Sequence, residues 1–241
     1  MFSRIEPLLP VLARCFAAAL LLAAGNSCSG GSSPTAVVDI DPNFGTNDPS
    51  VVVALGDSIT FGVFDEGVDL CSESYRGTAG FCPRLARLTG KTVINEGACG
   101  ETSGSGASRV ASVLQAWRPG VLLIDYSPND FYTGSDVVIA NLRAMITAAR
   151  NNHTVPILGT LTPATSTHRG WEPFIEGLNI DIRALCTELS VECADHYQAF
   201  VSDPSYIASP DALLSEDGLH PNAAGYEVMA RTWRWPLLRV Y

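Results

Sequence analysis

Short apolar runs alternate with amphipathic segments along the chain from about residue 50 to the C-terminus. Runs rich in β-branched residues predict five strands, at residues 50–55, 92–95, 121–126, 155–161 and 191–195. Between them, apolar residues recur at helical spacing, most clearly in the series Ile175, Leu178, Ile182, Leu185 and Leu189. Strands that alternate with helices predict a parallel sheet covered on both faces, in a doubly wound α/β fold.

The last predicted helix buries Tyr226 and Trp233 on one face. We expect it to begin at Pro221, because proline is favoured in the first helical turn. We expect it to stop before Pro236, because proline breaks the helical hydrogen bonds. No internal repeat is visible in the sequence, so the alternation predicts one domain over residues 47–241.

The N-terminal segment has the pattern of an export signal. Two arginines in residues 1–14 precede an uninterrupted run of small apolar residues at 15–25. That run is about half of the roughly 20 residues that a membrane-spanning helix needs. Ala23-Ala24-Gly25 suits cleavage by an ordinary signal peptidase, whereas Ser27-Cys28 followed by Gly and Ser suits a lipoprotein signal with a lipidated Cys28. Both alternatives are open.

Either alternative takes the protein out of the cytoplasm. We expect residues 1–27 to be a signal peptide and residues 28–46 to be a linker, since that stretch is rich in Gly, Ser and Pro. The mature protein is then periplasmic or secreted, or it is a lipoprotein anchored to the cell envelope through Cys28.

Composition and charge narrow the classes of protein and partner. Of the 241 residues, 46% are apolar, which is enough for a buried core and excludes a disordered or fibrous chain. The net charge of −10 argues against a nucleic-acid partner, because such partners need a basic surface. The same charge opposes docking on anionic lipid, so we expect membrane contact only through a lipid anchor at Cys28.

The cysteines predict disulfides rather than a metal site. Two of the seven belong to the N-terminal segment, and five in the folded part allow up to two bridges and one free thiol in an oxidising compartment. The expected pairs are Cys71 with Cys82 and Cys186 with Cys193, with Cys99 left over. No Cys-x-x-Cys or Cys/His cluster has zinc spacing, so we expect no metal and no other cofactor.

Chemistry-bearing residues gather where predicted strands end, and in such a sheet those ends share one edge. The clusters are Gly56-Asp57-Ser58, the turn at residues 95–102, Ser127-Pro128-Asn129-Asp130, and Asp217-Gly218-Leu219-His220. A serine, a small turn, an amide side chain and an Asp-x-x-His supply a nucleophile, oxyanion donors, a general base and a carboxylate to orient it. The α/β-hydrolase elbow Gly-x-Ser-x-Gly is excluded because Thr60 stands where it needs glycine.

These clusters, in this order and spacing, resemble the GDSL family, also called SGNH hydrolases, from residue 51 to the C-terminus. The resemblance implies a three-layer α/β/α flavodoxin-like sandwich with a five-stranded parallel sheet. It implies that Ser58 is the nucleophile, His220 the general base and Asp217 the carboxylate that orients it. It further implies an oxyanion hole made by the backbone N–H groups of Ser58 and Gly100 and the side-chain amide of Asn129.

Two points about the predicted oxyanion donors need comment: the second donor has two candidates, and the sequence before Asn129 differs from the family motif. Gly97 is the other candidate for the second donor, but it is out of register with the family glycine. The third block of the family reads Gly-x-Asn-Asp, whereas this chain has Ser127-Pro128 before Asn129. Glycine adopts positive φ easily and serine rarely does, so the local backbone at Asn129 is where we expect a departure.

Some of these residues also have a purely structural interpretation. Ser58 is also suited to cap the helix that follows it, and Asp217 and His220 are suited to cap the last helix. His196, at the end of the fifth predicted strand, is interpreted as structural, and His168 as a solvated loop residue. Trp171 and Phe174 are expected to pack against the core or a lid, with the lining of an acyl pocket as the alternative.

Together with the export signal, the family resemblance implies an exported GDSL-type esterase or lipase that acts on a small-molecule or glycan ester, and we expect it to be a monomer. Short-chain, aryl and lysophospholipid-type esters are the expected substrates, with O-acetyl groups on polysaccharide as the alternative. An acyltransferase and a non-catalytic envelope binding module are further alternatives. Residues 63–81 and 162–171 are longer than their connections require, and we expect them to form two walls of the substrate cleft.

Overall fold

The computed structural model describes residues 43–65, 67–68, 71–126 and 128–241. The predicted signal peptide and most of the predicted linker lie outside these residues. Five strands form one parallel sheet in the order β2-β1-β3-β4-β5, which confirms the expected α/β fold. The strands are β1 (Asp48–Gly56), β2 (Thr92–Gly97), β3 (Pro119–Asp125), β4 (Val155–Gly159) and β5 (Glu192–Ala194).

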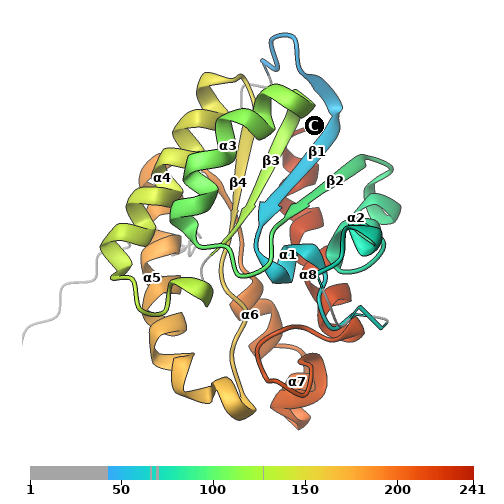
Figure 1. Ribbon diagram of the computed structural model, residues 1–241, viewed down its shortest axis with the longest axis vertical. Helices are drawn as coiled ribbons and strands as arrows, with labels where there is room; N and C mark the ends of the chain where they lie inside the picture. Colours follow the sequence, from blue (N-terminus) through green and yellow to red (C-terminus); the bar gives the residue numbers. More distant parts are fainter. Residues whose placement is uncertain (1–42, 66, 69–70, 127) are drawn as a thin grey trace, which may run out of the picture. The chain divides into compact units, whose positions relative to one another are not determined.

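Helices cover both faces of this sheet (Figure 1). The longer ones are α2 (Phe81–Thr89), α3 (Ser103–Trp117), α4 (Ser135–Asn151), α5 (Glu172–Leu189) and α8 (Ala223–Arg239). Short helices at the carboxyl ends of the strands are α1 (Ser58–Phe61), α6 (His196–Val201) and α7 (Pro204–Ala208). Short 3-10 helices are η1 (Glu73–Tyr75), η2 (Pro128–Asp130), η3 (Ser166–Trp171) and η4 (Pro210–Leu213).

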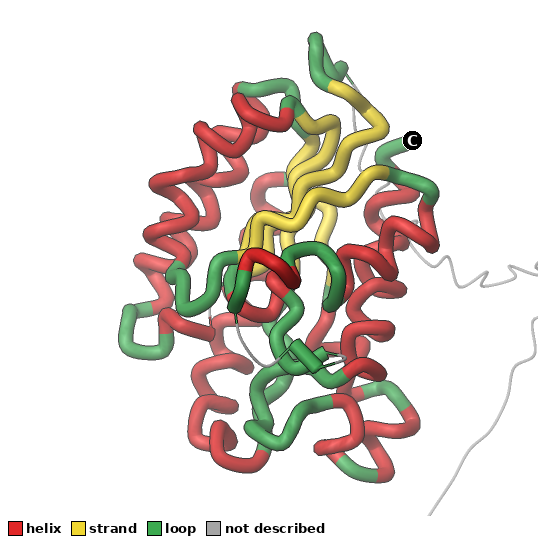
Figure 2. The backbone as a smooth tube through the Cα atoms, turned by 45° about the vertical axis from the view of Figure 1, so that its right-hand side comes forward, coloured by secondary structure: helices red, strands yellow, loops and turns green. Residues whose placement is uncertain are grey.

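Alternate residues of β1 belong to two separate hydrophobic clusters. Val53 and Leu55 pack with α3, α4 and α5, whereas Val52 and Ala54 pack with α2 and α8. All four side chains are fully buried, as expected for a parallel sheet covered on both faces. The loops at the carboxyl ends of the strands gather below the sheet in Figure 2.

The last helix differs from the sequence prediction at both ends. It begins at Ala223, because the side chain of Asn222 caps it by accepting from the N–H groups of Ala224 and Gly225. It also runs past Pro236 to Arg239. Pro236 lies only one turn from the C-terminal end and is itself buried, so tertiary packing outweighs the one helical hydrogen bond that proline cannot make.

His196 is buried against the last helix, as a structural residue would be. It is 0% exposed, and its ring lies edge-on to Trp233 with the ring centroids 4.7 Å apart. Burial lowers the pKa of His196 to about 3, so the ring stays neutral at physiological pH.

A buried carboxyl group lies under the short helix α1. Asp125 is the last residue of β3, beside Gly56 of β1, and its Oδ2 accepts a hydrogen bond from Thr60 Oγ1 at 3.1 Å. Burial raises the pKa of Asp125 to about 7, and the Thr60 hydrogen bond offsets only part of this effect. Because the folded state holds this proton more tightly than the unfolded chain, the stability it contributes is lost as pH rises through about 7.

Substituting Asp125→Asn should therefore stabilise the protein at high pH and have little effect at low pH. The amide stays neutral and can still accept from Thr60, so we expect a gain of up to about 4 kcal/mol in the free energy of unfolding at pH 8. The gain should shrink toward zero at pH 4. Urea unfolding of both proteins at the two pH values measures it, and an equal difference at both would contradict the assignment.

Candidate active site

Ser58 is the first residue of α1, directly after the turn that ends β1. Asp57 caps this helix, because its Oδ1 accepts from the Ile59 N–H at 2.9 Å. The helix is closed after one turn by the Gly62 N–H, which donates to the carbonyls of Ser58 and Ile59. The partly exposed Ser58 thus lies at a helix N-terminus, where the first backbone N–H groups have no partner inside the helix.

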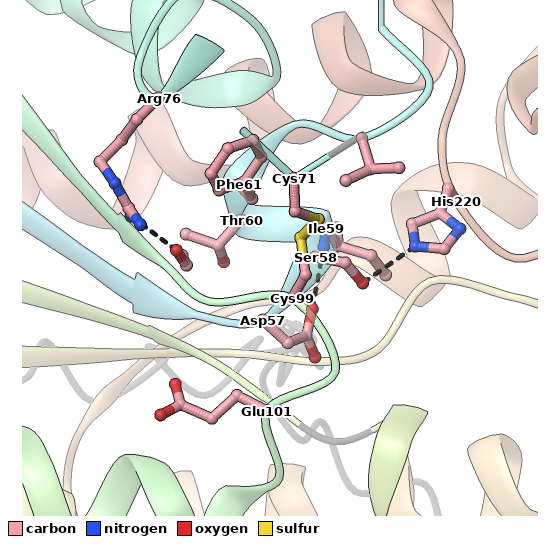
Figure 3. The surroundings of a disulfide bond; sticks show 12 residues. Asp57, Ser58, Ile59, Thr60, Phe61, Cys71, Arg76, Cys99, Glu101 and His220 are labelled. Atoms are coloured by element: carbon pink, nitrogen blue, oxygen red, sulfur yellow. Dashed lines mark hydrogen bonds between the residues drawn. A yellow bond between two sulfur atoms is a disulfide. The ribbon is translucent and has the colours of Figure 1, made fainter. Parts of the chain in front are cut away.

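A chain of two hydrogen bonds connects Ser58 to the Asp-x-x-His cluster. His220 Nε2 lies 2.9 Å from Ser58 Oγ, and His220 Nδ1 lies 2.6 Å from Asp217 Oδ2. Figure 3 shows the imidazole directed at the serine hydroxyl from a different part of the chain. The structure therefore brings together three residues that span more than 160 positions in the sequence.

Asp217 is surrounded by donors that favour its ionised form. Its Oδ1 accepts from Ser215 Oγ at 2.6 Å and from the N–H groups of Leu219 and His220 at 2.9 and 3.1 Å. Partial burial acts to raise the pKa of Asp217, but the hydrogen bonds from His220, Ser215 and Leu219 outweigh it and hold the pKa well below its usual range. The carboxylate is therefore fixed in position and charged.

The loop that follows β4 supports the turn carrying Asp217. Gly218 has φ +71°, and a Cβ there would lie 2.3 Å from the carbonyl oxygen of Thr165, so only glycine fits without displacement. The Thr165 N–H donates to the Gly218 carbonyl at 2.7 Å. The Asp217 carbonyl in turn accepts from Thr167 Oγ1 and from His168 Nδ1 at 2.8 and 2.7 Å. His168, expected to be a solvated loop residue, instead holds this turn.

The turn after β2 and the turn after β3 meet at the carboxyl edge of the sheet. Gly100 has φ +73°, which glycine adopts without strain. Asn129, in η2, donates from Nδ2 to the Glu101 carbonyl at 3.0 Å. Gly97, the alternative to Gly100, ends β2, and a Cβ there would fall 2.2 Å from the Phe61 N–H nitrogen, so Gly97 allows α1 to approach the sheet.

The residue after Asn129 ties these two turns together. Both oxygens of Asp130 accept from Ser103, from its backbone N–H at 2.8 Å and its hydroxyl at 3.0 Å, at the start of α3. Pro128 begins η2, whereas Ser127 lies outside the described residues. The replacement of the family glycine thus still leaves the Asn129 amide within hydrogen-bonding distance of the turn after β2.

The predicted Cys71–Cys82 pair is wrong. The structure joins Cys71 to Cys99, with the Cα atoms 6.2 Å apart, and leaves Cys82, Cys186 and Cys193 as free thiols. Cys82 is closer in sequence, but it lies in the first turn of α2 and is buried in the core. Cys99 is the residue before Gly100, and because β1 and β2 are neighbours, the turn after β2 reaches the segment that follows α1. Figure 3 shows this disulfide next to Ser58.

The predicted Cys186–Cys193 pair is likewise not formed in the structure. Cys186 is buried in α5, and Cys193 in β5 packs against the same hydrophobic cluster. A hydrogen bond with Cys193, together with burial, raises the pKa of the Cys186 thiol, so this thiol stays protonated.

Aromatic side chains border the site on two sides. Phe64, in the long segment after the nucleophile, packs its ring against His220 with a centroid distance of 5.3 Å. Phe131, two residues after Asn129, stacks on Trp171 at 5.0 Å and contacts Phe174 at 5.5 Å, and Trp171 meets His168 at 4.7 Å. We call Phe131, His168, Trp171 and Phe174 the aromatic wall; it links the turn carrying Asn129 to the loop that holds Asp217.

Features of other classes of protein are not found in the part of the chain that is described. Within residues 43–241, apart from the gaps given above, no three His, Cys, Asp or Glu side chains are grouped to hold a metal ion. In the same residues, no helix has the length and apolar character needed to cross a membrane.

A model of the GDSL-like lipase/acylhydrolase family matches residues 54–228, a stretch that includes Ser58, Gly100, Asn129, Asp217 and His220. The chain belongs to this family. It is therefore a GDSL-type hydrolase, and the resemblance found in the sequence is confirmed. No significant relative was found among curated proteins.

Solved structures agree with this GDSL fold. A protein from Desulfitobacterium hafniense, assigned to the G-D-S-L family of lipolytic proteins, is 24% identical with a TM-score of 0.65, over 78% of this chain and 99% of its own. A GDSL-like lipase from Bacteroides thetaiotaomicron is 24% identical with a TM-score of 0.61, over 80% and 89%. A variant of an acetyl-xylooligosaccharide esterase from Geobacillus is 19% identical with a TM-score of 0.63, over 79% and 95%. At these identities the likeness is one of fold.

Peptide mapping of the protein purified without reduction tests the cysteine pairing. We expect one cross-linked peptide pair that contains Cys71 and Cys99 and that separates on reduction, with Cys82 recovered as a free thiol after denaturation. A Cys71–Cys82 link would contradict the structure.

Proposed function

We propose that this GDSL hydrolase is an exported serine esterase that cleaves carboxylic acyl esters through an acyl-serine intermediate. The observation that carries the proposal is the continuous chain from Asp217 through His220 to Ser58, with hydrogen bonds of 2.6 and 2.9 Å. A serine hydroxyl is a weak nucleophile on its own and needs a base within hydrogen-bonding reach. Histidine serves because its ordinary titration lies nearest to neutral pH.

In the acylation step, Ser58 Oγ attacks the ester carbonyl carbon while His220 Nε2 takes the hydroxyl proton. Asp217 accepts a hydrogen bond from His220 Nδ1, and this bond fixes the imidazole tautomer in which Nε2 is free to accept a proton. The Asp217 carboxylate also stabilises the imidazolium ion that forms. The tetrahedral intermediate then collapses, and His220 returns the proton to the oxygen of the leaving alcohol as the carbon–oxygen bond breaks. Water repeats the sequence on the acyl-serine, releasing the carboxylic acid and restoring Ser58.

The oxyanion of each tetrahedral intermediate needs preorganised donors. The Ser58 N–H is offered at the N-terminus of α1, and the Gly100 N–H in the neighbouring turn. Asn129 Nδ2 carries two hydrogens, of which one is held by the Glu101 carbonyl, so the second is oriented for the oxyanion. In comparable enzymes, losing one such donor lowers kcat by about 10²–10³-fold.

The aromatic wall and Phe64 favour substrates with apolar groups near the ester. Flat rings pack well on aromatic side chains, which supports short-chain and aryl esters, and lysophospholipid-type esters are the larger members of the same class. A second candidate is O-acetyl groups on polysaccharide, because one structural neighbour is named as an acetyl-xylooligosaccharide esterase. Both reactions use the same chemistry at Ser58 and differ only in the group beside it.

Export is part of the proposal. It is supported by the signal-like pattern of residues 1–27 and by the Cys71–Cys99 disulfide, since disulfides persist mainly outside the reducing cytosol. The peptide map described above also gives the first residue of the mature chain, which distinguishes cleavage after Gly25 from a lipidated Cys28. A mature chain that begins at Met1 would contradict export.

Replacing the nucleophile tests the proposed function. We expect Ser58→Ala to lower kcat by about 10³-fold or more on p-nitrophenyl esters from acetate to palmitate, with an unchanged circular dichroism spectrum. The matched control Ser112→Ala, on the exposed face of α3, should keep wild-type kcat. Acetylated xylan in the same assay separates the two substrate classes.

Labelling with a fluorophosphonate complements the kinetics. The reagent should modify the wild type at Ser58 and leave Ser58→Ala unlabelled. Full turnover by Ser58→Ala would disprove the assignment, and a folded wild type that neither hydrolyses any ester nor reacts with the reagent would favour a binding module.

A further inference from the structure

Glu101 directly follows Gly100, yet its side chain does not face the nucleophile. Figure 3 shows the carboxylate directed away from Ser58, on the far side of the turn. The side chain is only 12% exposed. Glu101 is next in sequence to Gly100, the proposed oxyanion donor, and its carboxylate would oppose the negative charge that forms there. A largely buried Glu101 therefore needs a compensating partner.

Arg109, on α3, supplies that partner. Its Nε donates to the two carboxylate oxygens of Glu101 at 2.8 and 2.9 Å, and its Nη2 donates to Oε2 at 2.6 Å. The Tyr126 hydroxyl donates to the same Oε2 at 2.5 Å. Burial, together with the hydrogen bond to Glu101, raises the pKa of Tyr126 above its usual range, so the hydroxyl stays a donor. We call Glu101, Arg109 and Tyr126 the Glu101 clamp.

The guanidinium of Arg109 also binds the ends of two strands. Its Nη2 donates to the Glu96 carbonyl at 2.6 Å, in β2, and to the Gly56 carbonyl at 3.4 Å, at the end of β1. Its Nη1 lies 3.2 Å from Glu96 Oε2. Gly56 is two residues before Ser58, so one side chain connects the nucleophile's strand to the turn that carries Gly100.

The third oxyanion donor is connected to the same clamp through the backbone of Glu101. The Glu101 carbonyl accepts from Asn129 Nδ2 at 3.0 Å. Tyr126 lies three residues before Asn129, directly after β3, so the clamp holds the turn of Asn129 from its N-terminal side as well. On the other side of Gly100, the Cys71–Cys99 disulfide restrains the same turn.

We infer that Glu101 and Arg109 are positioning residues of the oxyanion hole: with Tyr126, their ion pair holds the Gly100 N–H and the Asn129 amide where the oxyanion forms. Arg109 also cancels the charge of the Glu101 carboxylate, which would otherwise oppose the oxyanion. Neither residue touches the substrate. The inference rests on the proposed function, in which Ser58 is the nucleophile.

The test uses kcat and KM for p-nitrophenyl acetate. We expect Glu101→Gln to lower kcat about tenfold while KM changes less than twofold, because the donors act on the transition state and not on substrate binding. The substitution leaves Arg109 its contacts with Glu96, so the fold should persist. Glu188→Gln removes a second bidentate arginine–carboxylate pair, with Arg143 at 2.7 Å on the outer helices, and should leave both constants unchanged.

A double-mutant cycle separates positioning from general stability. Asn129→Ala should lower kcat about a hundredfold or more. If Glu101 acts largely through Asn129, adding Glu101→Gln to Asn129→Ala should lower kcat by less than a further threefold. A full additional tenfold loss would overturn the role assigned through Asn129, and a Glu101→Gln enzyme with wild-type kcat would overturn the whole inference.

Two further measurements keep the outcome decisive. If Glu101→Gln fails to fold, as judged by circular dichroism, Tyr126→Phe replaces it; a lower kcat at unchanged KM then supports the clamp, and wild-type kcat overturns it. A wild type that shows no turnover and no fluorophosphonate labelling would instead refute the proposed function itself.

Discussion

The parallel register of β1 with its two neighbours is the constraint on which the site depends. It sets Gly56 beside Gly97 on one side and beside Asp125 on the other, so the three strands end at the same level of the sheet. Ser58 lies two residues after Gly56, Gly100 three after Gly97, and Asn129 four after Asp125. Short turns therefore suffice to bring a nucleophile and two oxyanion donors together, and a slip of one residue would reverse the faces of a strand and separate them.

Three of the acidic residues near the nucleophile differ in how the surrounding structure controls their charge. Asp217 is ionised, because four hydrogen bonds outweigh its partial burial. Glu101 is paired with Arg109 on the far side of the turn from Ser58. Asp125 is buried with its pKa raised to about 7. Hydrogen bonding, ion pairing and burial thus each act on a different carboxyl group near the site, in a protein whose net charge is −10.

The sheet and the principal site residues could be predicted from the sequence because their signals are local. Each strand is a short apolar run, and Ser58, Asn129 and His220 lie in clusters that follow strands or precede a helix. Partners between distant segments could not be predicted in this way. Cys71 is bonded to Cys99 and not to Cys82, which is nearer in sequence, and Glu101 is paired with Arg109. These contacts depend on which strands are neighbours in the sheet and on which face of a helix is turned toward them. No sequence pattern around His168 indicates its role, because the hydrogen bond to the Asp217 carbonyl depends on the turn at Gly218.

The central claim is that an ester oxyanion at Ser58 is held by the donors of three different segments. A crystal structure of the protein after reaction with a p-nitrophenyl phosphonate tests it most directly. We expect phosphorus bonded to Ser58 Oγ, with one phosphoryl oxygen at about 2.7–3.1 Å from the backbone nitrogens of Ser58 and Gly100 and from Asn129 Nδ2. A phosphoryl oxygen that faces away from Gly100 and Asn129, or an adduct on another residue, would contradict the account.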